Sequence, residues 1–122
     1  MSYQLFLDDV RVPSSVKWVE IPLGPWEIVR SYNAFVNIIT KRGLPTFISF
    51  DHDLAECDQN VHGKPYSEYK EKTGFHCAQW LVEYCLNNKL SCPDFTVHSM
   101  NPVGAENIRS LLRNFMLNNP HQ

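Results

Sequence analysis

The amino-acid sequence predicts an α/β domain built around a central, mainly parallel β-sheet. Three short apolar segments, at residues 3–7, 46–50 and 95–98, have the length and composition of buried strands. Segments with the apolar period of amphipathic helices alternate with them. Because a helix that connects two parallel strands makes a right-handed crossover, this alternation predicts one parallel sheet covered on both faces.

The first half of the chain is predicted to contain one helix between the first two of these strands. Residues 12–27 are rich in proline and contain a glycine, so we expect a loop with one short edge strand at residues 17–21. Ser31 is the expected N-cap of the helix, and Gly43 ends it. The apolar residues that share one face of this helix are Tyr32, Phe35, Val36 and Ile39.

The second half is predicted to contain two helices and the last strand. A polar stretch at residues 58–73 follows the strand at 46–50, and we expect a loop that acts as a lid. The next helix is expected to end near Asn87. Asn101 and Pro102 predict the N-cap and the first turn of the last helix. The inward faces of these helices are Cys77, Trp80, Leu81, Tyr84 and Cys85 in one, and Ile108, Leu111, Leu112 and Phe115 in the other.

Length and charge restrict the class of protein. The 122 residues suit a single domain that spans residues 1–122. A formal net charge of -2 predicts no extended surface for nucleic acid. The N-terminal segment lacks the pattern of a secretion signal, and no apolar run approaches the roughly 20 residues that cross a bilayer. We therefore expect a cytoplasmic protein without a membrane partner, of an oligomeric state that the sequence does not predict.

The four cysteines are predicted to be reduced structural thiols. Cys57, Cys77, Cys85 and Cys92 contain no CxxC pair among them. Two of them lie on a predicted helical face, where cysteine acts as a small hydrophobic residue. A zinc site or a disulfide framework is the alternative.

Ionisable and polar residues follow all three predicted strands. Since the carboxyl ends of parallel strands share one edge of the sheet, these side chains are expected to lie around a single concavity. Taken alone, the first pair also fits a turn with a cap, because aspartate is favoured there. The residues are Asp8 and Asp9 after the first strand, Asp51, His52 and Asp53 after the second, and His98 and Ser99 at the end of the third.

The carboxylates predict a metal site and the histidines predict proton transfer. Hard cations such as Mg²⁺ or Mn²⁺ prefer oxygen ligands, so the expected ligands are Asp8, Asp9, Asp51 and Asp53. The imidazoles titrate near neutral pH and are expected to act as general acid and base. The predicted catalytic residues are His52, His98 and Asp51, the last through the cation that it helps to hold.

A substrate phosphate is expected at the start of the last helix. The segment 99–107, "SMNPVGAEN", brings the N–H groups of a helix N-terminus to the same edge, and its glycine allows close approach. Arg11 serves either as a phosphate clamp or as a surface partner of the neighbouring aspartates. The expected substrate-binding residues are Arg11, Ser99, Asn101, Gly104 and Asn107.

Three segments resemble the signatures of the cyclic-phosphate-processing receiver-like domain family. They are "LFLDDVRVP" at residues 5–13, "ISFDHDL" at 48–54 and "VHSMNPVGAENI" at 97–108, and Trp80 between them also fits. The resemblance spans nearly the whole chain. It implies a receiver-like (flavodoxin-like) three-layer sandwich and a role in hydrolysing cyclic phosphates of nucleotides or RNA ends. ADP-ribose cyclic phosphate is a further candidate substrate.

Signalling by phosphorelay is disfavoured by the same segments. In receivers of phosphorelays, Asp8 and Asp9 would match the acidic pair, and Asp51 would match the phosphoacceptor. The end of the last predicted strand lacks the lysine that such receivers need, and His52 and Asp53 depart from their pattern.

The sequence thus predicts a phosphoesterase in which a cation assists the in-line attack of water on a small cyclic phosphodiester or an RNA terminus. Two alternatives remain. A non-catalytic module that binds or sequesters a cyclic nucleotide would use stacking aromatic residues such as Trp18, Trp26 or Tyr66, although such residues more often supply buried area. A metal-binding interaction domain would need an exposed apolar face, for which residues 12–27 are the candidate.

Overall fold

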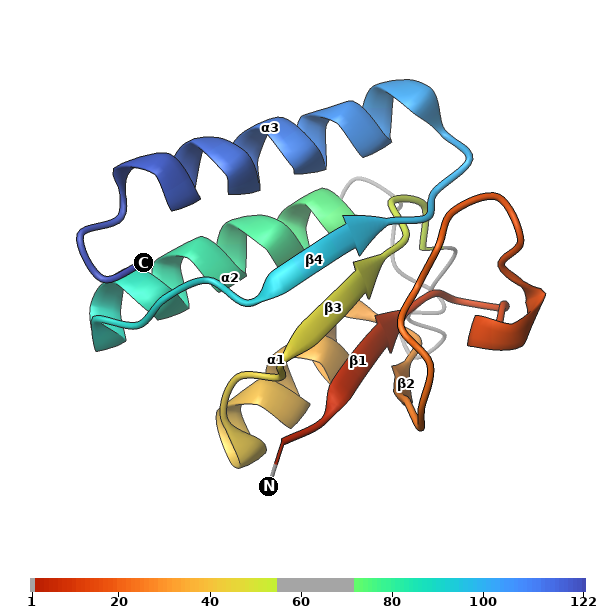
Figure 1. The fold of residues 1–122 in the computed structure, drawn as a ribbon, viewed down its shortest axis with the longest axis horizontal. Coiled ribbons are helices and arrows are strands. Elements are labelled where there is room, and N and C mark those ends of the chain that lie inside the picture. Colours follow the sequence, from red (N-terminus) through yellow and green to blue (C-terminus); the bar gives the residue numbers. More distant parts are fainter. Residues whose placement is uncertain (1, 55–71) are drawn as a thin grey trace, which may run out of the picture.

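The computed structural model describes residues 2–54 and 72–122. In this part of the chain, four strands form one parallel sheet in the order β2-β1-β3-β4, and helices follow β2, β3 and β4 (Figure 1). The predicted receiver-like α/β class with a parallel sheet is confirmed. The strands are β1 (Gln4–Leu7), β2 (Glu27–Val29), β3 (Phe47–Phe50) and β4 (Asp94–Val97), and the helices are η1 (Pro13–Ser15, a 3-10 turn), α1 (Tyr32–Arg42), α2 (Gly74–Asn88) and α3 (Pro102–Asn118).

The helical layer lies on one face of the sheet. Helix α1 contacts α2, and α2 contacts α3. Alternate strand residues pack against all three helices in one apolar cluster, as expected when strand side chains alternate between faces. The strand residues in this cluster are Leu5, Leu7, Val29, Ile48, Phe50 and Val97, and the helix residues include Phe35, Ile39, Cys77, Leu81, Ile108 and Leu112.

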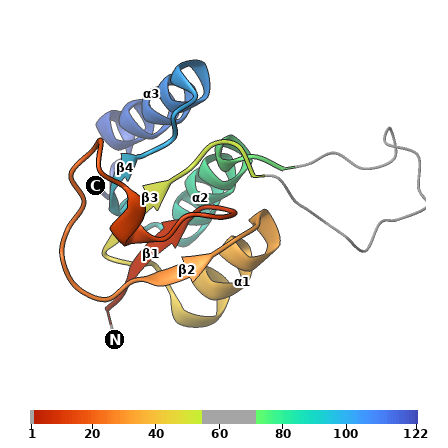
Figure 2. The same ribbon diagram turned by 90° about the vertical axis from the view of Figure 1, so that its right-hand side faces the viewer.

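The opposite face of the sheet is covered by the irregular segment between β1 and β2. Figure 2 shows this segment on the side of the sheet away from α1 and α2. The Gln4 amide donates to the carbonyl of Pro25 at 3.2 Å, and Trp26 meets Phe6 and Phe47 edge to face at 6.0 and 6.1 Å. Among residues 2–54 and 72–122, the third layer of the expected sandwich is therefore formed by this segment and not by an α-helix.

The predicted edge strand at residues 17–21 is wrong. The strand at the β1 edge of the sheet is instead β2, in which Ile28 is paired with Phe6 of β1. Residues 17–21 form no strand, and the indole N–H of Trp18 donates to the carbonyl of His98 at 2.7 Å. The valine and isoleucine in 17–21 favour a strand locally, but this tertiary contact directs the segment across the ends of the strands.

The predicted helix caps are confirmed. The hydroxyl of Ser31 accepts the N–H of Ala34 at 3.1 Å, and the side-chain oxygen of Asn101 accepts the N–H of Gly104 at 3.0 Å. Each bond satisfies a first-turn N–H group that lacks a partner within its helix. Of the predicted loop at 58–73, residues 58–71 lie outside the described residues.

The described cysteines are buried free thiols. They are Cys77, Cys85 and Cys92. Burial raises the pKa of Cys85 to about 11 and that of Cys92 to about 12, so both stay protonated at neutral pH. Cys57 lies outside the described residues. Across the described part of the chain, none of the helices has both the length and the apolar character that spanning a bilayer requires.

Candidate functional site

The register of the sheet aligns the ends of three strands. Leu7 of β1 is paired with Phe50 of β3, and Phe50 is paired with Val97 of β4. The next residue of each strand therefore lies at the same level, on the face covered by the segment between β1 and β2. These residues are Asp8, Asp51 and His98, and Figure 1 shows the three strand ends at one edge of the sheet.

Asp8, Asp51 and His98 form a buried cluster. One potential ligand atom from each lies within 4.8 Å of the others. The Nε2–H of His98 donates to Oδ2 of Asp8 at 2.9 Å, and its Nδ1 is hydrogen-bonded to the hydroxyl of Ser49 at 2.7 Å. The imidazole also stacks on Phe6, with ring centres 4.5 Å apart. Both ring nitrogens of a fully buried histidine are therefore occupied.

The two buried carboxylates have different proton affinities. Burial would raise the pKa of Asp8, but hydrogen bonds to its carboxylate outweigh burial and hold the pKa well below its usual range. The donors are His98 and the backbone N–H groups of Val10 and Arg11. Burial and the negative charge of Asp8 raise the pKa of Asp51 to about 6. The charge on Asp8 therefore disfavours a second negative charge on Asp51.

A second polar group lies at the rim of this cluster. The Nδ1–H of His52 donates to Oδ1 of Asp53 at 2.8 Å, and the Asn101 amide donates to both oxygens of Asp53 at 3.3 Å. Because Asn101 also caps α3 through Gly104, one hydrogen-bonded chain links the end of β3 to the start of α3. The bond to Asp53 thereby fixes the orientation of the His52 ring. It also favours the tautomer with the proton on Nδ1, in which Nε2 is an acceptor.

Two glycines allow this close packing. A Cβ atom on Gly104 would lie 2.4 Å from Cγ of His52, so the imidazole rests against the first turn of α3. A Cβ atom on Gly74 would lie 1.8 Å from the carbonyl oxygen of Asp51. The backbone N–H of Gly74 donates to the carbonyl of His52 at 2.7 Å. The role of Gly74 was not predicted. The sequence signal that could have indicated it is the Thr73-Gly74 pair, which is typical of an N-cap followed by the first residue of a helix.

Arg11 contacts three parts of the site. Its guanidinium lies 3.7 Å from the Asp8 carboxylate, donates to the sulfur of Met100 at 3.5 Å and stacks over Trp18 at 5.2 Å. Arg30, which was not predicted as a site residue, holds the Asp8–Arg11 turn by donating to the carbonyls of Asp8 and Arg11 at 3.3 and 2.7 Å. The turn that carries Asp8 is thus fixed from both sides.

The buried carboxylates fit a divalent cation such as Mg²⁺ or Mn²⁺, which prefers oxygen ligands. Asp8 and Asp51 bring two carboxylates together, and the repulsion that raises the pKa of Asp51 is one that a bound cation relieves. Nε2 of His98 is engaged by Asp8, so the oxygens are the suitable ligands. Asp9 and Asp53 lie outside the group of ligand atoms within 4.8 Å of one another.

Comparison with protein families identifies the domain. Residues 3–114 match the family described as cyclic-phosphate processing receiver domain. The chain belongs to this family. No curated protein and no solved structure has significant similarity to the chain. The description of the family links the domain to the processing of cyclic phosphates.

Within this receiver domain, the remaining predicted site residues differ in position. Asp9 is half-buried, and its negative charge contributes to the raised pKa of Asp51. The hydroxyl of Ser99 accepts the N–H of Asn101 at 3.1 Å, so it shapes the turn before α3. Asn107 is exposed on α3, and the described residues show no hydrogen bond from it to the cluster. Trp26 packs against the sheet away from the strand ends, and Tyr66 lies outside the described residues.

The first turn of α3 offers fewer donors for phosphate than expected. Pro102 has no N–H group, the N–H of Gly104 donates to the Asn101 side chain, and the N–H of Ala105 donates to the Asn101 carbonyl. Val103 retains the first-turn N–H without an intrahelical partner. An anion at this helix end would therefore depend on neighbouring side chains as well.

Proposed function

We propose that this receiver domain is a phosphoesterase that hydrolyses a cyclic phosphate of a nucleotide, an RNA end or ADP-ribose. The observation that carries the proposal is the His52–Asp53 pair at 2.8 Å, placed beside a buried pair of carboxylates. A base held by an acidic partner, next to a potential cation site, is suited to the hydrolysis of phosphate esters. Membership in a family that processes cyclic phosphates supports the same chemistry.

His52 is the proposed general base. Its Nδ1 is bonded to Asp53, which leaves Nε2 to accept a proton from water. The imidazole is partly exposed, with 17% of the side-chain surface accessible, so a substrate can approach it. Gly104 lets the ring pack against α3, and this packing restricts its rotation.

Asp8 and Asp51 are the proposed ligands of Mg²⁺ or Mn²⁺, with Asp9 nearby. Such an ion, when bound, neutralises charge on the nonbridging phosphate oxygens. Arg11 adds a guanidinium next to the same carboxylates and can bind phosphate through its N–H groups.

The proposed reaction is the in-line attack of water on phosphorus. The water oxygen forms a bond to phosphorus, one ester bond of the ring breaks, and Nε2 of His52 takes the proton of the water. The leaving oxygen takes a proton from solvent, which gives a phosphate monoester and a free hydroxyl group. His98 is now proposed as a positioning residue for Asp8 and not as the acid, because it is fully buried and both ring nitrogens are engaged.

Sequestration of a cyclic nucleotide without turnover is the second candidate. Trp18 favours it, because 41% of its surface is exposed while its N–H is fixed to the carbonyl of His98. A rigid, exposed indole at the rim of the site is suited to stacking on a nucleobase.

The two candidates predict different products. The protein is incubated with 2′,3′-cyclic nucleotides and with ADP-ribose cyclic phosphate, with and without Mg²⁺ or Mn²⁺, and the phosphorus species are followed by ³¹P NMR. A phosphoesterase converts the cyclic diester to a monoester, and His52→Ala lowers turnover by roughly 10²–10⁴-fold. His121→Ala, at an exposed position away from the site, is the matched control. Bound but intact ligand contradicts hydrolysis and supports sequestration.

A further inference from the structure

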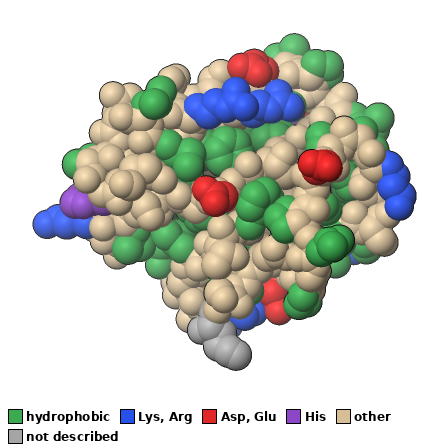
Figure 3. Space-filling view, in the orientation of Figure 1, with side chains coloured by type: hydrophobic (Ala, Val, Ile, Leu, Met, Phe, Trp, Pro, Cys, Tyr) green, Lys and Arg blue, Asp and Glu red, His purple; other side chains and the backbone are tan. Residues whose placement is uncertain are grey.

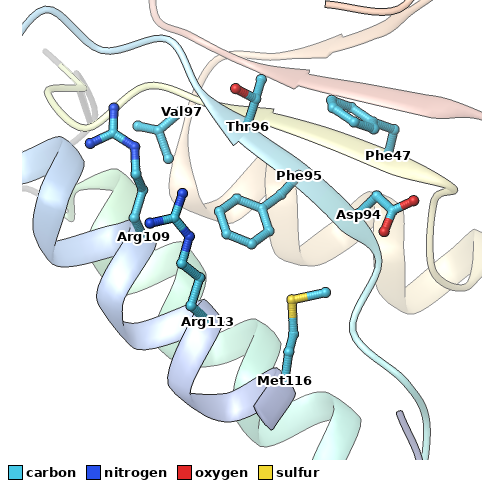
Figure 4. A pocket seen from close by; sticks show the side chains of 8 residues that line it. All are labelled: Phe47, Asp94, Phe95, Thr96, Val97, Arg109, Arg113 and Met116. Atoms are coloured by element: carbon cyan, nitrogen blue, oxygen red, sulfur yellow. The ribbon is translucent and has the colours of Figure 1, made fainter.

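A groove of about 460 Å³ lies between β4 and α3, apart from the cluster at the strand ends. It combines apolar side chains with two arginines. Figure 4 shows both arginines extending from α3 toward β4, with Phe95 directed into the space between strand and helix. The lining residues are Phe47, Asp94, Phe95, Thr96, Val97, Arg109, Arg113 and Met116.

The strand that borders this groove is an edge strand. Among the described residues, β4 pairs only with β3. The N–H of His98 donates to the carbonyl of Phe50, and the direction of hydrogen bonding alternates along a strand. The N–H and C=O groups of Phe95 and Val97 therefore face away from β3. These groups can bind an extended segment, as exposed edges of other sheets do.

The two arginines of the groove indicate the charge of the segment that it can bind. Arg109 has one exposed ion pair, with Glu106 at 3.4 Å, and such surface pairs are weak. Within the described part of the chain, Arg113 has no acidic side chain within ion-pairing distance. In Figure 3, basic side chains lie next to hydrophobic ones on the face where α3 runs along β4. Basic groups over an apolar floor complement a segment with acidic and apolar side chains.

We propose that this groove binds an extended segment of a partner protein that carries acidic residues at alternate positions. Arg109 and Arg113 are four residues apart on one helical face, a rise of about 6 Å. Alternate residues of a strand are about 6.6 Å apart and point to the same side. Two acidic side chains in an i, i+2 arrangement therefore match the two guanidinium groups, while the backbone adds a fifth strand next to Phe95 and Val97.

The opposite end of the groove defines the next position of the segment. Asp94 and Met116 lie there, beyond Arg113. A third carboxylate would be repelled by Asp94, whereas an apolar side chain can pack on Met116. The bound segment thus has two alternating acidic residues, followed by an apolar residue toward the Asp94 end. This binding does not depend on whether the site at the strand ends is catalytic.

The test uses a synthetic peptide of seven residues with blocked ends, which has glutamate at its second and fourth positions and valine at the other five. Titration into the ¹⁵N-labelled protein is expected to shift the amide signals of Phe95 and Val97. The same peptide with lysine in place of glutamate, or with proline in place of valine, is expected not to bind, because it lacks the charge or the N–H groups of a strand. Absence of binding by the glutamate peptide at 1 mM overturns the proposal.

Variants of the protein locate the interaction. Arg113→Glu is expected to weaken binding of the glutamate peptide about tenfold at low salt, since it replaces an attraction with a repulsion. Lys41→Glu makes the same charge change on exposed α1 and is expected to leave binding unchanged. Equal affinity of wild type and Arg113→Glu contradicts the proposal. The proposal is also contradicted if sedimentation velocity detects a dimer that Arg113→Glu dissociates, because a second copy of the chain would then occupy the groove.

Discussion

Replacing Asp51 with asparagine is expected to stabilise the ion-free protein above about pH 6. Asp51 is 4% exposed, and burial together with the charge of Asp8 raises its pKa to about 6 from its ordinary value of 3.8. Between these two values the folded chain keeps a proton that the unfolded chain has released. Stability therefore falls as the pH rises through this window, and the full loss is present above pH 6.

The size of the effect follows from the shift of the pKa. A shift of about 2 units corresponds to about 3 kcal/mol, because each unit is worth about 1.4 kcal/mol. Asparagine has nearly the same shape and does not ionise. The difference in unfolding free energy between Asp51→Asn and wild type is thus expected to increase by up to about 3 kcal/mol from about pH 4 to about pH 7.5, in favour of the variant.

Urea denaturation in the presence of EDTA measures this difference. Asp8→Asn is the control with the opposite sign, because hydrogen bonds hold the pKa of Asp8 low. The charged form of Asp8 stabilises the fold above its ordinary pKa, and this stability is lost as the pH falls below it. Asp8→Asn is therefore expected to cost about 2 kcal/mol at neutral pH. A difference between Asp51→Asn and wild type that stays within about 0.5 kcal/mol across this pH range refutes the reasoning.

Three further substitutions test the packing of the site. His98→Ala is expected to cost about 3 kcal/mol in urea denaturation, because it opens a cavity and removes the imidazole N–H that donates to Oδ2 of the buried Asp8. Gly74→Ala is expected to cost at least about 2 kcal/mol, since its Cβ would overlap the carbonyl of Asp51, and an unchanged midpoint would disprove that contact. Gly104→Ala is expected to displace His52 and lower turnover of a cyclic phosphate about tenfold or more, with a shift of the imidazole NMR signals.

The sheet and the convergence of its strand ends were predictable from local patterns. Three apolar runs define β1, β3 and β4, and parallel strands bring the residues after them to one edge. The edge strand β2 was not predictable, because Glu27–Val29 is short and its register depends on contacts with β1. The covering of one face by an irregular segment depends equally on Trp26 and its contacts with Phe6 and Phe47.

The residues of the site were predictable in type but not in role. Sequence spacing placed His98 at the strand end, but its burial follows from Phe6 and Ser49 on neighbouring strands, which only the folded sheet brings to it. The His52–Asp53 bond joins adjacent residues, yet its fixed geometry depends on Asn101, distant in sequence. The proposed division of these residues into metal ligands and a general base therefore rests on side-chain contacts that the sequence alone does not provide.

Hydrolysis of a 2′,3′-cyclic nucleotide in ¹⁸O-labelled water tests the central claim most directly. With Mg²⁺ or Mn²⁺ present, attack of water on phosphorus places one labelled oxygen on the phosphate monoester, which ³¹P NMR detects as a small upfield shift of the monoester signal. Wild type and His121→Ala are expected to give this labelled product at equal rates. His52→Ala is expected to form it at a rate at least roughly 10²-fold lower. A cyclic diester signal that persists unchanged with the wild-type protein, or an equal rate with His52→Ala, contradicts the proposed site.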